Sequence, residues 1–84
     1  MRISARTQYA LGAMLALAVA DGPVHAEWIA ATQEIPRRFC DNNLLQLRRA
    51  GLIHSRRGPG GGYWLARPAK EIALADVVAS SEAP

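Results

Sequence analysis

Residues 36–66 read PRRFCDNNLLQLRRAGLIHSRRGPGGGYWLA, and this stretch decides the fold. Its first half repeats apolar residues every three to four positions, which predicts a helix from Pro36 to about Ala50. Proline suits the first position of a helix, because the N–H that it lacks would have no partner there. Gly51 then supplies the stop. The apolar face of this helix consists of Phe39, Leu44 and Leu47, with Cys40 beside them.

The pattern after Gly51 is that of a β-hairpin. Residues 52–55 and 63–66 are short aliphatic and aromatic runs, and they flank a connection, 56–62, with four glycines in its last five positions. Glycine reaches positive φ angles and adds no bulk. The sequence therefore predicts two strands joined by a thin tip, which is narrow enough to enter a minor groove of nucleic acid.

The N-terminal segment fits either a folded helix or a cleaved leader. Ser4 can cap a helix that stops at Asp21-Gly22-Pro23. The apolar run 10–20 follows Arg2 and Arg6 and ends in a small-x-small pattern, so this outline also matches a secretory signal peptide. The run is too short for a membrane-spanning helix, which needs about 20 apolar residues, and we expect no membrane partner.

Two further helices complete the pattern. Residues 25–32 predict a short helix with Trp28 and Ile29 facing inward, and about three residues join it to the helix from Pro36, as in a helix-turn-helix. Residues 72–80 predict a last helix with Leu74, Val77 and Val78 as its apolar positions. The order of helix, helix, helix, hairpin and helix predicts a mainly α fold with a small β-hairpin wing. We therefore expect a single winged helix-turn-helix domain over residues 1–84.

The charge of the chain is concentrated in one stretch. Ten Lys and Arg residues oppose seven acids, a net charge of +3. Between Pro36 and Arg57, however, six arginines face a single acid, Asp41, which gives that stretch a charge of +5. A basic stripe on a small domain indicates an anionic polymer as the partner.

The motifs of the sequence argue against an enzyme. The glycine-rich connection lacks the Lys-Ser/Thr of a phosphate-binding P-loop and lies between two strands rather than before a helix. No serine, cysteine or carboxylate is paired with a plausible base. Cys40 is the one cysteine in the chain, so it forms no internal disulfide and fits a reduced, cytoplasmic setting.

The whole chain resembles a known family, the Rrf-two family of bacterial winged-helix transcription regulators, whose members include IscR, NsrR and CymR. The matching segments begin with Met1-Arg2-Ile3-Ser4 and Tyr9-Ala10, and continue through Ile29-Ala30 and residues 35–39. They are densest in residues 44–52 and in the arginine, glycine-rich connection and tyrosine of residues 57–66, and they end in residues 72–78. The family uses the first segment as its folded first helix, which favours the helix over the leader.

The resemblance implies a sequence-specific DNA-binding regulator, expected to be a repressor, that binds a double-stranded operator as a homodimer in its full-length form. The helix from Pro36 would then read the major groove, and the wing would place Arg57 in the minor groove and Arg56 on a phosphate. Asp41 corresponds to an acidic position that family members use to discriminate bases, and Asn42 is placed to pair with adenine. The predicted DNA-binding residues are Arg37, Arg38, Asp41, Asn42, Arg48, Arg49, Arg56, Arg57, Gly58, Gly60, Gly61 and Gly62.

Several of these residues have a second interpretation. Arg37 and Arg38 could be solvated surface, and Arg48 and Arg49 could complement the dipole of the helix end instead of contacting DNA. We interpret Trp28, Phe39, Tyr63 and Trp64 as core or hairpin packing rather than stacking platforms. The alternative for the whole domain is a winged helix that binds another protein without specific DNA binding.

No cofactor is expected in this chain. The resemblance implies that members with an iron-sulfur cluster carry about three cysteines beyond the last short helix, near a long dimerisation helix, and the sequence ends at Glu82-Ala83-Pro84 where that dimerisation and sensor segment would begin. Some members use an acid of the first helix as a further ligand, and Gln8 stands there in this sequence. A lone cysteine on an apolar helix face, as at Cys40, predicts a buried small hydrophobe.

Overall fold

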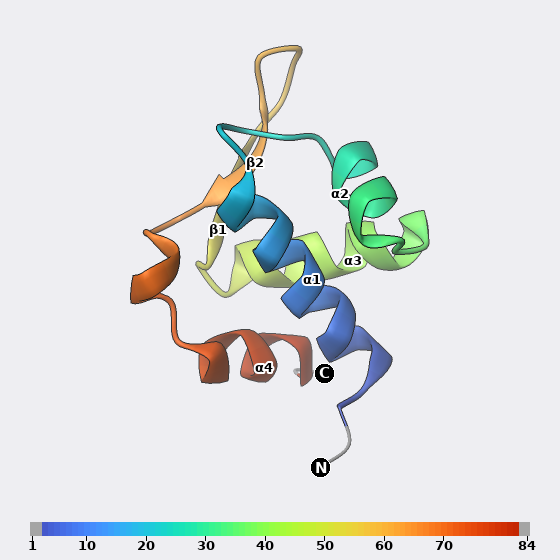
Figure 1. Cartoon of the computed structure of the whole chain (residues 1–84), viewed down its shortest axis with the longest axis vertical. Helices are drawn as coiled ribbons and strands as arrows, with labels where there is room; N and C mark the ends of the chain where they lie inside the picture. The colour runs from blue at the N-terminus through green and yellow to red at the C-terminus, as the bar shows by residue number, and fades with distance from the viewer. Residues whose placement is uncertain (1–2, 83–84) are drawn as a thin grey trace.

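The computed structural model describes residues 3–82; Met1, Arg2, Ala83 and Pro84, at the two ends of the predicted domain, lie outside the described residues. The chain folds as a winged helix with a two-stranded antiparallel hairpin (Figure 1). Its elements in order are α1 (Ala5–Val19), α2 (Ala26–Gln33), α3 (Arg37–Arg49), β1 (Ile53–Arg56), β2 (Gly62–Leu65), the 3-10 helix η1 (Ala69–Glu71) and α4 (Leu74–Glu82).

Helix α1 is the central element of the core. The hydroxyl of Ser4 accepts a hydrogen bond from the N–H of Thr7 at 3.2 Å, which caps the helix as predicted. The helix packs against α2, α3, α4 and β2, so its wide apolar arc is covered on more than one side. Ala13 and Ala16 are fully buried, and these small side chains let the neighbouring helices approach. Most of the apolar run 10–20 therefore lies in a folded helix that buries one side of the run in the core.

The turn between α2 and α3 is fixed by local backbone geometry. Glu34 adopts a left-handed conformation with φ of 53°, and the N–H of Ile35 donates to the carbonyl of Ala30 at 2.9 Å. Ile35 is buried and ties the turn to the core. Pro36 caps α3 from outside, one position before the predicted one, because its ψ of 134° is not helical.

The hairpin pairs Ile53 with Leu65, His54 with Trp64, Ser55 with Tyr63 and Arg56 with Gly62. Both strands are shifted by one residue from the predicted ranges. Gly51, with φ of 77°, ends α3 as predicted, and the N–H of Leu52 still donates to the carbonyl of Leu47. The carbonyl of Leu52 accepts a hydrogen bond from the N–H of Ala66, so Leu52 joins the end of α3 to the hairpin just before β1 begins.

Three aromatic and aliphatic side chains lie outside the core, contrary to prediction. Trp28 is 41% exposed, Phe39 is 38% exposed and Leu74 is 66% exposed. Residues one apart on a helix point about 100° apart, and the inward face of α2 centres on Ile29. On α3 the inward face follows Cys40, Leu44 and Leu47, so Phe39 lies at its edge.

The segment after the hairpin differs from the single predicted helix 72–80. Residues 69–71 form η1, and α4 runs to Glu82. The hydroxyls of Thr7 and Ser81 are 2.7 Å apart in the buried interior, which joins the end of α4 to the start of α1. Within residues 3–82, no helix has both the length and the apolarity to cross a membrane.

Candidate nucleic-acid interface

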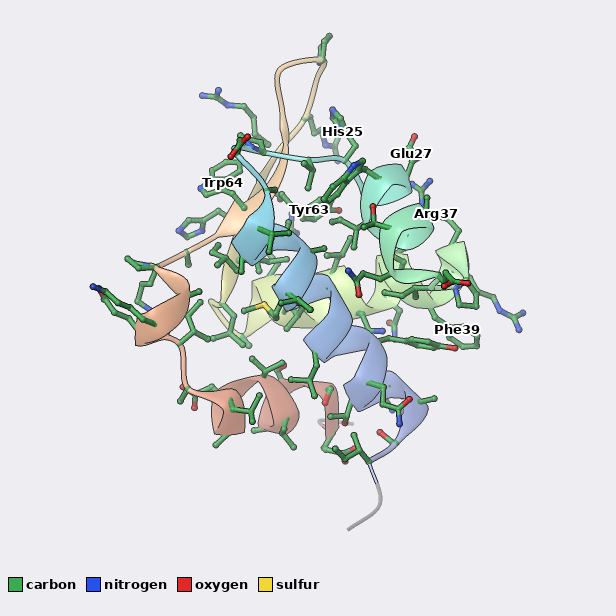
Figure 2. The ribbon with its side chains drawn as sticks, viewed as in Figure 1. His25, Glu27, Arg37, Phe39, Tyr63 and Trp64 are labelled. Atoms are coloured by element: carbon green, nitrogen blue, oxygen red, sulfur yellow. The ribbon has the colours of Figure 1, made fainter. Side chains whose placement is uncertain are left out.

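A groove with a volume of about 370 Å³ runs between the start of α2, the exposed face of α3 and the base of the wing. Figure 2 shows His25 and Glu27 at the start of α2, with Arg37 next to them and Tyr63 on the hairpin side. The groove contains four arginines and two carboxylates, a net charge of +2 with histidine neutral. Its lining residues are His25, Ala26, Glu27, Arg37, Asp41, Arg48, Ser55, Arg56, Arg57, Gly58, Gly62 and Tyr63.

The arginines reach this groove from two separate parts of the chain. Arg37 and Arg48 lie on α3, whereas Arg56 ends β1 and Arg57 begins the wing loop. The guanidinium of Arg48 donates to the hydroxyl of Ser55 at 3.1 Å, which links the end of α3 to the hairpin. All four arginines are exposed. The fold thus brings the helix and wing cations to the two sides of one groove.

Arg37 and Asp41 are paired with each other. The Nε of Arg37 donates to Oδ1 of Asp41 at 3.0 Å, and its Nη1 lies 3.8 Å from Oε1 of Glu27 on α2. The hydrogen bond to Asp41 raises the pKa of Arg37, and the negative charges of Asp41 and Glu27 raise it further. Asp41, predicted to read base edges, therefore enters the groove as the partner of an arginine.

Of the predicted residues that do not line the groove, Gly61 is buried, and the others are exposed. The guanidinium of Arg38 lies 4.9 Å from the ring centroid of Phe39, and Phe39 in turn stacks on Tyr9 at 5.8 Å. This stack holds Arg38 at the outer edge of α3. Asn42 and Arg49 lie on exposed positions of the same helix, and Gly60 lies in the exposed wing tip.

Glycine is required at different positions of the wing for different structural reasons. Gly58 and Gly62 have φ of 97° and 128°, which favours glycine. A Cβ on Gly62 would also lie 2.7 Å from the backbone of Val24, whose N–H and carbonyl exchange hydrogen bonds with Tyr63. A Cβ on Gly61 would overlap the carbonyl oxygen of Arg56. These contacts fix the base of the wing against the loop that precedes α2.

Sequence reasoning missed His25, Glu27, Ser55 and Tyr63 as groove residues. Among these residues, Glu27 alone has a feature that the sequence shows, since it is an acid in the first turn of a helix, where a negative charge is favourable. This feature does not predict an ion pair with a residue of another helix. The contribution of all four residues depends on how α2 and the hairpin pack against α3.

The described residues do not fit an iron or iron-sulfur site. Cys40 is fully buried, and its Sγ lies 3.9 Å from the carbonyl oxygen of Ala26. Gln8 is exposed, and its amide donates to the carbonyl of Ile3 at 3.5 Å. Residues 3–82 hold no group of three or more His, Cys, Asp or Glu side chains placed to bind a metal ion.

The hairpin behind a helix-turn-helix, with a shared basic groove, defines the chain as a winged-helix domain. The chain belongs to the Rrf-two family, described as iron-dependent transcriptional regulators, which it matches over residues 3–84. It is 42% identical over 82 residues to IscR of Photobacterium profundum, which covers 95% of this chain and 48% of that protein.

Two solved structures share the fold closely. IscR of T. potens superposes with a TM-score of 0.90 and 34% identity, covering 99% of this chain and 62% of that one. CymR of B. subtilis, titled the global cysteine regulator, gives a TM-score of 0.90 and 32% identity, covering 100% of this chain and 67% of that one. The chain spans about half the length of the curated relatives it matches.

Proposed function

We propose that this chain is the DNA-binding part of a transcription regulator that recognises a double-stranded operator. The observation that carries the proposal is the groove whose sides bear arginines from α3 and from the wing. An α-helix fits the major groove of B-DNA, and arginine matches both phosphate oxygens and guanine edges. Cations on both α3 and the wing suit a DNA duplex, because its major and minor grooves lie next to each other with phosphates between them.

Each element then has its own role. Helix α3 enters the major groove, where Asp41 and Asn42 face base edges and Arg38, Arg48 and Arg49 face phosphates. The wing places Arg57 in the adjacent minor groove, since narrow A·T-rich minor grooves attract arginine. Arg56 ends β1, so it lies nearer the strand and contacts a phosphate.

The full-length protein acts as a homodimer and a repressor in the cytoplasm. An apolar groove of about 250 Å³ between α1, β2, η1 and α4 supports a protein contact on a separate face. Leu15 and Leu74 line this groove and are 59% and 66% exposed, so apolar side chains are accessible to another protein on this face. Two copies would place two α3 helices on successive major-groove half-sites.

The test is a titration of duplex DNA at several salt concentrations with single alanine variants. R48A and R56A should each reduce the magnitude of the slope of log K against log salt by about 0.9, the value for one phosphate contact in B-DNA. R57A should weaken the preference for A·T-rich positions. K70A is the matched control, because Lys70 lies in η1, on the other side of the hairpin from α2 (Figure 1).

An equal effect of R48A, R56A and K70A on the slope would contradict the proposal. Slopes that stay unchanged in R48A and R56A would favour the protein-binding alternative, in which the arginines have no polyanion to contact.

A further inference from the structure

Glu27, Arg37 and Asp41 form a cluster, here called the Arg37 bridge, in which one guanidinium joins carboxylates from α2 and α3. The contacts use one oxygen of each carboxylate, Oε1 of Glu27 at 3.8 Å and Oδ1 of Asp41 at 3.0 Å. All three side chains line the basic groove. The bridge therefore carries a net charge of −1 in the middle of a surface whose other charged side chains are arginines.

Stability does not account for this arrangement. The side chains of Glu27, Arg37 and Asp41 are 74%, 51% and 55% exposed, and ion pairs this exposed contribute little to the free energy of folding. A carboxylate in a groove for a polyanion also opposes phosphate binding. The bridge is better explained by what it does to the ligand than by what it does to the fold.

We infer that Glu27 is a specificity-determining positioning residue, an inference that rests on the proposed DNA binding. By holding Arg37 on the carboxylates, Glu27 keeps the guanidinium away from phosphates and keeps the bridge negative. A negative bridge favours the amino groups of cytosine and adenine, which are hydrogen-bond donors in the major groove. It disfavours phosphates, which are present in every sequence. Glu27 thus lowers the affinity for arbitrary DNA more than the affinity for the operator.

The substitution E27Q removes the charge and keeps the size of the side chain. Arg37 then keeps Asp41 as a partner but loses its second anchor, so it can turn to a phosphate. For a mixed-sequence duplex, we expect the salt slope to steepen by about 0.9, so that affinity falls roughly threefold more between 50 and 200 mM salt than in the wild type. The ratio of affinities for a duplex selected by the wild type and for the mixed duplex should fall.

Two matched variants distinguish the effect of the Arg37 bridge from the effect of removing any one negative charge. E71Q removes the same charge from η1, and it should change neither the slope nor the ratio. In an R37A background, E27Q should steepen the slope by much less than in the wild type, because only the charge of Glu27 is then removed. If the slope steepens there as much as in the wild type, direct repulsion by Glu27 explains the whole effect and the inference is wrong.

A second readout works without DNA and separates the inference from the proposed function. In the free protein, E27Q should speed the rotation of the Arg37 Nη groups about the Nε–Cζ bond, measured by NMR, because Nη1 is the atom that faces Glu27, whereas E71Q should leave it unchanged. Equal rotation rates in wild type and E27Q would overturn the inference. Failure of the wild type to bind any duplex would instead overturn the proposed function, and with it the role of Glu27 in specificity.

Discussion

Replacing Gly61 with alanine should disrupt the wing, whereas the same change at Gly60 should not. A Cβ on Gly61 would overlap the carbonyl oxygen of Arg56 and would lie 2.7 Å from that of Arg57. These are backbone atoms, so they cannot turn away as a flexible side chain could. A Cβ on Gly60 would meet nothing within 4 Å, and its φ lies outside the positive values found at Gly58 and Gly62.

The two variants form a matched pair. Each change from glycine to alanine lowers the entropy of the unfolded chain and so stabilises by about 0.4–1 kcal/mol. This contribution cancels in the comparison, which leaves the strain in the native state. Forcing an extra carbon into a packed site costs about 1–3 kcal/mol, so the free energy of unfolding of G61A should lie below that of G60A by about this amount.

Urea denaturation followed by tryptophan fluorescence measures the difference, because Trp64 lies on β2 next to the wing. A lower midpoint for G61A and a slightly raised midpoint for G60A are the expected result. Equal midpoints would show that the loop opens without cost, and would refute the reasoning that close approach to Arg56 requires glycine at position 61.

Three further predictions concern the core and its cysteine. L44A should lower the free energy of unfolding by about 2–5 kcal/mol in urea denaturation, because Leu44 is fully buried; a loss under 1 kcal/mol would contradict this packing. Burial raises the pKa of the Cys40 thiol, and the charge of Asp41 adds to this. Stability from the neutral thiol is therefore complete below the unfolded pKa of about 8.5 and is lost as pH rises through the higher folded pKa. Thiol-reagent kinetics at pH 8.5 should be slow in the folded protein and fast in urea, whereas equal rates would place the thiol at the surface. Anaerobic reconstitution of this 84-residue chain with iron and sulfide should leave it colourless, and a brown product with stoichiometric iron would contradict the ligand argument.

The start of α1 and the end of α3 could be predicted because local chemistry sets them. Ser4 caps α1, and Gly51 takes the left-handed conformation that stops α3. Both signals act within a few residues, so the sequence alone contains them. The first strand begins one residue later than predicted because the N–H of Leu52 donates to a carbonyl of α3, a contact that the spacing of apolar residues does not reveal.

The exposure of side chains and the composition of the groove depended on tertiary packing. The spacing of apolar residues identified α2 and α3 but did not show which residue lies at the centre of each buried face. Trp28 and Phe39 were therefore predicted to face inward, and both lie outside the core. The contact of Glu27 with Arg37 joins different helices, so no periodicity within one helix predicts it. The arginines were identifiable by type and clustering, and their common groove required the fold.

The most direct test of the DNA-binding face is an NMR map of backbone amide shifts as a duplex is added. The account predicts shifts along the exposed side of α3, at residues 56–62 of the wing and at the start of α2, with few in η1 and α4. The strongest shifts should include Arg48, Arg57 and Gly60. Shifts confined to the apolar groove around Leu15 and Leu74, or none with any duplex at low salt, would contradict the claim that helix and wing bind DNA together.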